Sequence, residues 1–209
     1  GASKKGILVK GSNYLEALAK AEIAVFDKTG TLTKGVFKVQ KIQAKEPERL
    51  LKLAAYAENY SNHPISLSIK EAYNKEIDSQ HIFSTEEISG YGVSAVVEGT
   101  EVLVGNDKLM EKYNILYDKQ SLGGTVVHVA ADRNYLGYLL ISDEIKQDSF
   151  EAVEKLKKQN IKQIIMLTGD SELSGKNTAY ELGINNVYTQ LLPMDKVNIV
   201  EELIAKKSG

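Results

Sequence analysis

The sequence contains no cysteine and no tryptophan, and only 3 prolines occur in its 209 residues. The lack of cysteine excludes disulfides, thiolate nucleophiles and cysteine-ligated metal centres. With 3 prolines and 16 glycines, collagen-like and low-complexity chains are excluded as well. Apolar runs such as Ile164–Leu167 fall far short of the roughly 18 residues that a membrane helix needs. We therefore expect this chain by itself to be soluble.

The two signs of charge are nearly balanced, with 26 lysines and arginines against 28 aspartates and glutamates. A net charge of -2 gives no basic field for nucleic acid or an anionic membrane, so any site for phosphate must be local. Hydrophobic residues make up 43% and charged residues 26%, as in globular proteins of one or two domains. The chain begins without methionine, and no apolar run follows Lys4 and Lys5, so we interpret it as a piece of a longer protein rather than a secreted precursor.

Two buried strands are predicted to deliver polar loops. The apolar run Ile23–Phe26 stops at Asp27, and the run Ile164–Leu167 stops at Thr168, Gly169 and Asp170. Amphipathic helices are expected on both sides of the second strand, over about 147–158 and about 197–204. This alternation favours βαβ units and a parallel sheet.

The middle of the chain has a different pattern. One helix is expected to begin at Pro47 and another after His63, and from Ile88 onward short strands separated by turns predict antiparallel pairing. We therefore divide the chain into an α/β domain in two segments, about 1–35 and 143–209, and an inserted α+β domain, about 36–142.

In open α/β sheets, ligands bind beyond the carboxyl ends of the strands, so Asp27 and the loop 168–170 are expected to converge. A carboxylate can attack a phosphoryl group and hold it as an acyl phosphate. Two like charges about 4 Å apart cost on the order of 4 kcal/mol at an effective dielectric of about 20, so such a reaction requires cations. Lys196 and a divalent ion are the candidates.

The run Asp27–Thr33 (DKTGTLT) matches at every position the phosphorylation signature of P-type ATPases, whose phosphorylation domain has the haloacid dehalogenase fold. The later order also resembles that family, with Thr168-Gly169-Asp170 followed by Pro193–Lys196. In the inserted domain, a further set of residues is similar to the nucleotide-binding pattern of the heavy-metal-transporting branch: Glu58, Ser61–Pro64, Gly90–Gly92 and Gly105–Asn106.

The resemblance implies a haloacid-dehalogenase-like doubly wound parallel sheet, C-terminally truncated, with an inserted α+β nucleotide-binding domain that contains an antiparallel sheet. It implies an ATP-binding and aspartyl-phosphorylation fragment of a pump that exports heavy-metal cations, with ATP and Mg²⁺ as cofactors. In the full-length protein the partners would be the actuator and transmembrane domains and a transported divalent metal ion, and the fragment would lie on the cytoplasmic side of a membrane. Segments 6–11, 14–18 and 191–193 resemble zinc and cadmium pumps more than copper pumps.

The resemblance also implies a role for each matched residue in the α/β domain. Asp27 would accept the γ-phosphoryl group of ATP, and Asp27 with the carbonyl of Thr29 would hold Mg²⁺. Lys196 would neutralise developing charge. The remaining catalytic candidates are Lys28 beside the nucleophile, Thr168 as a donor to a phosphoryl oxygen, Gly169 for close backbone approach and Asp170 for the orientation of the loop.

In the inserted domain, the resemblance implies that His63 contacts adenine and that Glu58 accepts its amino group. The nucleotide would approach the backbone at Gly90 and Gly92, with Gly105 and Asn106 completing the pattern. By contrast, His81 and His128 have no partner at ligand spacing and are expected to be structural. Asp143 is expected where the chain returns to the α/β domain.

Alternatives remain open at this point. The chain could be a catalytically inert nucleotide-binding module, or part of a copper pump. A soluble phosphatase is disfavoured because Thr29 stands where related phosphatases carry an acid/base aspartate. The family's Gly-Asp-Gly-x-Asn-Asp loop does not occur before Gly209, which makes autophosphorylation doubtful and predicts an open sheet edge beside the strand ending at Asp27.

Overall fold

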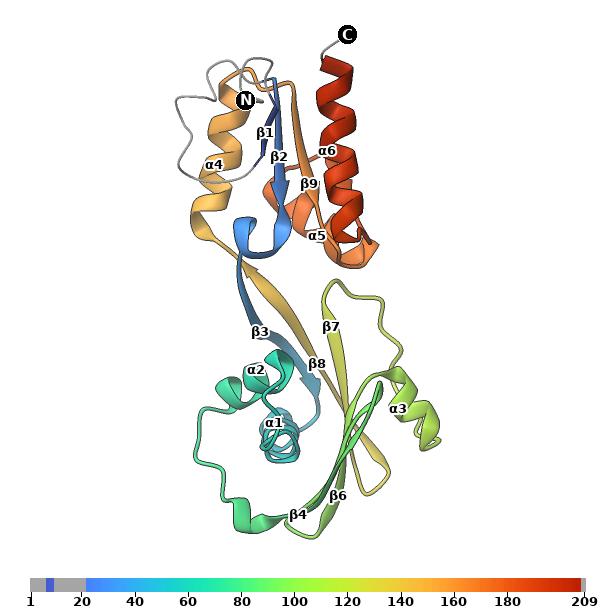
Figure 1. Cartoon of the computed structure of the whole chain (residues 1–209). Coiled ribbons are helices and arrows are strands. Elements are labelled where there is room, and N and C mark those ends of the chain that lie inside the picture. Colours follow the sequence, from blue (N-terminus) through green and yellow to red (C-terminus); the bar gives the residue numbers. More distant parts are fainter. Residues whose placement is uncertain (1–6, 10–21, 208–209) are drawn as a thin grey trace. The chain divides into compact units, whose positions relative to one another are not determined.

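The computed structural model describes residues 7–9 and 22–207, and the chain divides into two compact units. Unit 1 contains the described residues up to Gly35 and those from Asp143 onward, and unit 2 is Val36–Ser142. Strands β3 (Thr33–Ala44) and β8 (Asn134–Ile145) carry the chain from one unit to the other (Figure 1). Of the segments 6–11 and 14–18, only Ile7–Val9 lies within the described residues.

Unit 1 is built on a parallel sheet in the order β1-β2-β9-β10. The strands are β1 (Ile7–Val9), β2 (Ile23–Asp27), β9 (Gln163–Leu167) and β10 (Asn186–Tyr188). The prediction of an open sheet edge beside β2 is wrong, because β2 lies between β1 and β9.

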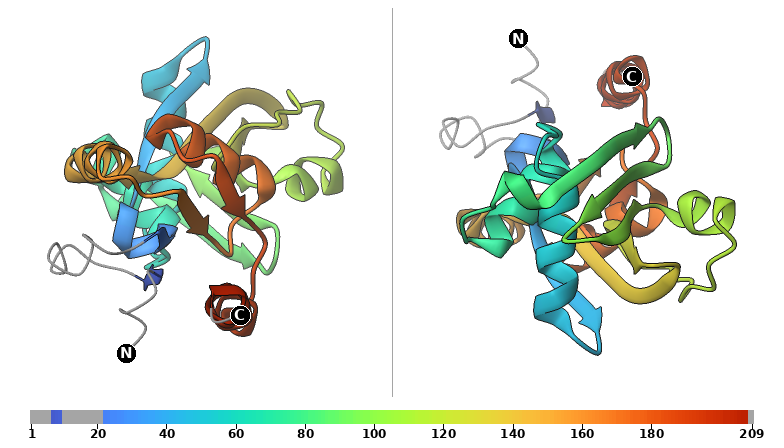
Figure 2. Two further views of the ribbon diagram at one scale, coloured as in Figure 1. Left: turned by 90° about the horizontal axis from the view of Figure 1, so that it is seen from above. Right: turned by 90° about the horizontal axis from the view of Figure 1, so that it is seen from below.

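Helices cover both faces of this sheet. On one face, Ala24, Ile164 and Met166 pack with α4 (Gln147–Lys158) and α5 (Glu172–Leu182). On the other face, Val25, Ile165 and Leu167 pack with α6 (Pro193–Lys207). Figure 1 and the left view of Figure 2 show α4 and α6 on opposite sides of the strands. Successive side chains of each buried strand point to opposite faces of the sheet, so both faces are apolar and both are covered by helices.

Unit 2 contains a six-stranded sheet in the order β3-β8-β7-β6-β5-β4, antiparallel from β8 to β4. Besides β3 and β8, its strands are β4 (Ile82–Ile88), β5 (Gly92–Val97), β6 (Thr100–Gly105) and β7 (Thr125–Ala131). Helices α1 (Pro47–Ala57) and α2 (Pro64–Tyr73) pack in the main core against one face. The short helix α3 (Asp107–Lys112) packs in a second cluster with Leu103 and Ala130.

Several elements lie outside the predicted pattern. Strands β1, β3, β4 and β10 and helices α3 and α5 were not predicted, and antiparallel pairing begins at Ile82 rather than Ile88. Pro47 does open α1, and α4 spans the predicted residues 147–158. Within residues 7–9 and 22–207, none of the helices has the length and apolar character needed to cross a membrane.

Candidate active site and nucleotide site

Asp27 and the loop after Leu167 lie together at one end of the parallel sheet. In the β2–β9 pairing, Asp27 is opposite Leu167, so Thr168 follows immediately beside it. The parallel register of two buried strands produces this juxtaposition, because equivalent strand ends then meet at the same edge. The structure therefore brings together the two polar loops that the sequence singled out.

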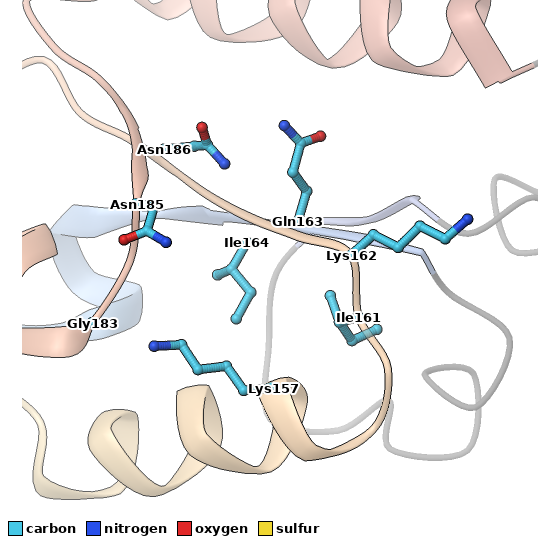
Figure 3. A pocket seen from close by; sticks show the side chains of 8 residues that line it. All are labelled: Lys157, Ile161, Lys162, Gln163, Ile164, Gly183, Asn185 and Asn186. Carbon is cyan, nitrogen blue, oxygen red and sulfur yellow. The ribbon is translucent and has the colours of Figure 1, made fainter.

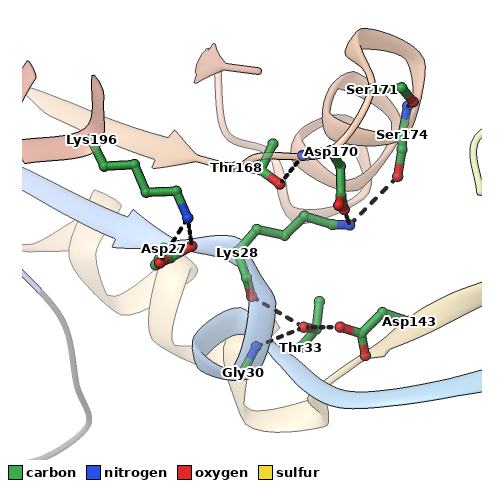
Figure 4. Close-up of polar contacts among 10 residues, drawn as sticks. All are labelled: Asp27, Lys28, Gly30, Thr33, Asp143, Thr168, Asp170, Ser171, Ser174 and Lys196. Carbon is green, nitrogen blue, oxygen red and sulfur yellow. Dashed lines mark hydrogen bonds and ion pairs between the residues drawn. The ribbon is translucent and has the colours of Figure 1, made fainter. Parts of the chain in front are cut away.

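The carboxylate of Asp27 is paired with the ammonium group of Lys196 from the first turn of α6. Lys196 Nζ lies 3.1 Å from Oδ1 and 3.2 Å from Oδ2, so one donor group bridges both oxygens (Figure 4). The side chains of Lys196 and Asp27 are 27% and 43% exposed, which leaves this pair accessible to a ligand. The start of α6 is fixed by Asp195, whose Oδ2 accepts from the backbone N–H of Leu192 at 2.8 Å.

Lys28 points away from Asp27, as expected for the next residue at the end of a strand (Figure 4). Its side chain is 4% exposed, and its ammonium group donates to the carboxylate of Asp170 and, at 3.5 Å, to Ser174 Oγ. A buried ammonium group requires such a partner, since isolated charges are strongly disfavoured in the interior. The structure thus gives Lys28 a part in positioning the 168–170 loop and no contact with the Asp27 carboxylate.

The turn after Asp27 is stabilised by hydrogen bonds to the buried side chain of Thr33. Thr29 and Gly30 depart from helical geometry, and Gly30 has φ +76°, a conformation that glycine adopts without strain. The buried Thr33 hydroxyl accepts from the N–H of Gly30 at 3.2 Å and lies 3.1 Å from the carbonyl of Lys28 and 2.6 Å from Asp143 Oδ2. Asp143 therefore anchors the turn at the point where the chain re-enters unit 1.

The second loop is fixed by Thr168. This residue is fully buried, and its Oγ1 accepts from the backbone N–H of Asp170 at 3.1 Å. In this contact the hydroxyl oxygen accepts and thereby shapes the turn, while the role expected from the sequence, donation to a phosphoryl oxygen, stays a prediction. A Cβ at Gly169 would lie 3.0 Å from the carbonyl oxygen of Leu191, so close backbone approach explains this glycine.

A divalent ion at the strand ends would find few protein ligands. Within residues 7–9 and 22–207, no three histidine, aspartate or glutamate side chains are grouped so that they could hold a metal. Asp27 contributes a carboxylate, and the expected second ligand is the Thr29 carbonyl. Mg²⁺ commonly takes one or two carboxylates and completes its shell with water and substrate phosphate, and this donor set fits that habit.

In unit 2, Glu58 ends α1 and His63 begins α2. Glu58 is 7% exposed, and burial is the main cause that raises the pKa of its carboxyl group. The hydroxyl of Ser66 donates to Glu58 Oε2 at 2.6 Å, which acts in the opposite direction. His63 Nδ1 accepts from the N–H of Ile65 at 3.2 Å, so the exposed ring is held by its own helix.

The glycine-rich candidates of unit 2 also come together. Asn106 Nδ2 donates to the carbonyl of Gly90 at 2.9 Å, and its backbone N–H donates to the carbonyl of Tyr91 at 3.0 Å. Gly92 pairs with Gly105, and a Cβ on Gly92 would lie 2.1 Å from the carbonyl oxygen of Val104. Contact between two backbone segments therefore explains Gly92 and Gly105 without a ligand. The negative charge of Glu87 on β4 also raises the pKa of Glu58.

His128 is a structural histidine, as predicted. It is fully buried, with Nδ1 2.8 Å from the hydroxyl of Tyr135 and Nε2 2.7 Å from Asp107 Oδ1. His81 also has a partner, since its Nε2 lies 3.2 Å from Asp78. Within the described part of the chain, neither histidine belongs to a group of three or more histidine, aspartate or glutamate side chains that could hold a metal ion.

A separate hollow of about 360 Å³ lies at the start of β9, at the other end of the sheet from Asp27 (Figure 3). Its lining includes Lys157 from the last turn of α4, the segment 161–164, and Gly183, Asn185 and Asn186 near the end of α5. None of the candidate site residues takes part in it.

Three side chains of the two sites were not identified from the sequence as site residues: Thr33, Ser66 and Ser174. Thr33 lies within the signature, which could have drawn attention to it. Ser66 and Ser174 lie in no motif. Ser174 contacts Lys28 on another element, and Ser66 contacts Glu58 across the junction of two helices, so neither contact can be predicted from the neighbouring sequence.

Comparisons with known proteins cover nearly all of the chain. The sequence profile of the haloacid dehalogenase-like hydrolases matches residues 21–208. A cadmium, zinc and cobalt-transporting ATPase of Bacillus subtilis (strain 168) is 55% identical over 208 residues, which cover 98% of this chain and 30% of that protein. A zinc-transporting ATPase of Synechocystis sp. is 46% identical over 98% of this chain and 29% of its own length.

A solved structure agrees with these sequence matches. The crystal structure of a zinc-transporting PIB-type ATPase in the E2.Pi state superposes with a TM-score of 0.76 at 31% identity, covering 94% of this chain and 33% of that one. The predicted resemblance and the predicted fold class are thus confirmed. The chain spans about 30% of the length of the curated relatives that it matches.

Proposed function

The chain belongs to the haloacid dehalogenase-like hydrolase family, and from this premise we propose that it is the ATP-binding, aspartyl-phosphorylated part of a pump that exports heavy-metal cations. Unit 1 would be the phosphorylation domain and unit 2 the nucleotide-binding domain, on the cytoplasmic side of a membrane. The observation that carries the proposal is the accessible carboxylate of Asp27, bridged by Lys196 at the carboxyl end of β2. The names of the relatives favour zinc and cadmium over copper as the class of cargo.

In the proposed reaction, an oxygen of Asp27 attacks the γ-phosphorus of ATP. The bond from that phosphorus to the β–γ bridging oxygen breaks, ADP leaves with the electron pair, and Asp27 becomes an acyl phosphate. Lys196 holds the carboxylate in place and then faces the charge of the transferred group. Thr29 has no carboxyl group with which to activate water, so the intermediate would persist long enough to drive a conformational change.

Bound Mg²⁺ would neutralise charge on the phosphoryl oxygens, with Asp27 and the Thr29 carbonyl as its protein ligands. The other residues act on the geometry. Lys28 and Asp170 hold the loop beside the nucleophile, and Thr168 fixes the turn of that loop. ATP would bind unit 2 near Glu58 and His63 and near the backbone joined by Asn106.

The test is incubation of the chain with γ-labelled ATP and Mg²⁺, acid quench, and treatment with hydroxylamine. We expect a hydroxylamine-sensitive label that Asp27→Asn abolishes. The matched control is Asp148→Asn, which changes an exposed aspartate on α4 and should keep the label. Retained ATP binding without any label in the unaltered chain would instead support the alternative, a catalytically inert nucleotide-binding module.

A further inference from the structure

The junction between α1 and α2 contains a chain of hydroxyl groups that ends on Glu58. Ser66 Oγ lies 2.6 Å from Glu58 Oε2 and 2.9 Å from Ser61 Oγ, and Ser61 Oγ accepts from the backbone N–H of His63 at 3.2 Å. The hydroxyl group of Ser66 has a single hydrogen, which can be donated to only one of these two oxygens. The hydrogen bond to the carboxylate of Glu58 is the shorter and the stronger of the two. The Ser66 hydroxyl therefore donates to Glu58, and that of Ser61 donates to Ser66.

This arrangement is rigid. Ser66 is 3% exposed and Glu58 is 7% exposed, so solvent cannot replace the hydrogen bond between them. The loop that carries Ser61 is held by Lys70 of α2, whose ammonium group donates to the carbonyls of Asn59 at 3.1 Å and Ser61 at 3.0 Å. Both serines thus stand at fixed places relative to the carboxylate.

The two oxygens of Glu58 differ in what they bind. Oε2 accepts from Ser66, whereas among the residues that the structure describes none donates to Oε1. Oε1 is also absent from the fully buried polar atoms that lack a partner, so it retains contact with solvent. One oxygen is committed to the protein and the other is free to accept a hydrogen bond from a ligand.

We propose that Ser66, supported by Ser61, is a positioning residue for base recognition: it fixes Glu58 so that Oε1 accepts a hydrogen bond from the amino group of a 6-aminopurine. The inference rests on the proposed function, in which unit 2 binds ATP. A 6-oxopurine presents an acceptor at that position, which an ionised carboxylate repels. The Ser66 hydroxyl thereby acts on base selectivity without touching the nucleotide.

The protonation state of Glu58 provides a readout that packing alone would not change. Burial raises the pKa of this carboxyl group, and the nearby Glu87 raises it too, while Ser66, His63 and Lys70 lower it. Removal of the Ser66 hydroxyl should raise the pKa further, so Glu58 becomes protonated at a higher pH. A protonated carboxyl group can donate to a 6-oxo group and no longer favours a 6-amino group.

The experiment measures binding of ADP and inosine diphosphate to the 209-residue chain by calorimetry at pH 6 and pH 8. These diphosphates have no γ-phosphoryl group, so transfer to Asp27 does not intervene. For Ser66→Ala we expect ADP to bind about tenfold more weakly at pH 6, with a smaller loss at pH 8 and little change for inosine diphosphate. In the free protein, carbon NMR of the Glu58 carboxyl group should show a higher pKa than in the unaltered chain.

Two further variants separate positioning from stability. Ser68→Ala is the matched control, because Ser68 is equally buried on the same helix but bonds to the carbonyl of Ile65 at 2.6 Å. It should keep the affinity for ADP and the pKa of Glu58. Ser66→Thr, which keeps a hydroxyl group, should restore the selectivity for ADP.

The inference is overturned if Ser66→Ala weakens both diphosphates equally at both pH values, or if the Glu58 titration does not move. Failure of the unaltered chain to bind either ADP or ATP is a different result. It would overturn the proposed function itself, and the NMR titration would still report whether Ser66 controls the protonation of Glu58.

Discussion

The ion pair between the buried Lys28 and the partly exposed Asp170 predicts unequal losses of stability in unit 1 when one or the other partner is replaced. The side chain of Lys28 is 4% exposed and that of Asp170 is 42% exposed. Asp170→Asn leaves the ammonium group buried without a counter-charge, and removal of one partner of a buried pair costs about 3–5 kcal/mol. Because Asp170 is partly solvated, we expect the lower end of that range, about 3 kcal/mol. Lys28→Met leaves only a carboxylate that water already reaches, so its cost should stay below about 1.5 kcal/mol.

The assay is native-state hydrogen exchange of the backbone amides of Val25 and Ile165, which lie in the middle of β2 and β9. It reports unit 1 alone, even if the two units unfold separately. A loss of about 3 kcal/mol lowers the protection of these amides by a factor of roughly 100. The double variant with Met at 28 and Asn at 170 should resemble Lys28→Met, since no buried charge is then left.

The matched control breaks an exposed pair in the same unit. Glu172 and Lys176 pair along α5, and both side chains are 62% exposed, so Glu172→Gln should cost only about 0.3–0.5 kcal/mol. The reasoning is refuted if Asp170→Asn changes the protection no more than this control does. It is refuted equally if Lys28→Met proves more costly than Asp170→Asn.

Three further predictions concern unit 2. Gly92→Ala should destabilise it by more than about 3 kcal/mol, because the new Cβ meets the backbone of β6, whereas Gly99→Ala, at φ +79° with open space, should cost about 1 kcal/mol in thermal unfolding. Because the pKa of Glu58 is raised in the folded state, the contribution of Glu58 to stability is present below its unfolded pKa and is lost as pH rises through its folded pKa. We therefore expect Glu58→Gln to stabilise unit 2 at pH 7. The same variant should make the stability of unit 2, measured by urea unfolding, depend less on pH. His128→Phe leaves the hydroxyl of Tyr135 and a carboxylate without their partner and should cost about 1–3 kcal/mol, seen as faster hydrogen exchange in β7.

The ends of strands β2 and β9 in unit 1 were predicted well because an apolar run stops and a polar loop begins at the same residue. Buried parallel strands form short apolar runs, and β2 and β9 end where polar residues begin, at Asp27 and Thr168. The expectation that the loops converge needed only the general geometry of parallel sheets. It did not depend on any side-chain contact.

The elements that were not predicted have weaker patterns for physical reasons. Strand β4 is an edge strand, and Phe83 is 57% exposed on it, so no alternation of buried and polar residues marks it. Helix α5 contains Gly175, which normally disfavours a helix. There a Cβ would lie 2.4 Å from the side chain of Thr189, so the glycine permits close packing that a single sequence does not reveal.

The partner of Lys28 could not be predicted from the sequence. Both lysines were catalytic candidates, but only Lys196 was expected to neutralise charge at Asp27, whereas Lys28 was placed beside the nucleophile without a partner. The structure separates them by direction: the strand geometry turns Lys28 inward to Asp170, while α6 brings Lys196 to Asp27 from 169 positions away. Which lysine faces the nucleophile is a property of the packed sheet and helices.

The charges at the strand ends of unit 1 also bear on how a polyphosphate could bind there. Asp27, Asp143 and Asp170 carry three negative charges, and Lys28 and Lys196 carry two positive ones, so this group is net negative by one. Lys28 is already committed to Asp170, which leaves Lys196 as the only one of these two cations in contact with Asp27. Two like charges about 5 Å apart repel by roughly 3 kcal/mol at an effective dielectric of about 20, and ATP brings several negative charges. A bound nucleotide would therefore need a counter-charge of its own, and Mg²⁺ held by Asp27 and the Thr29 carbonyl would supply it.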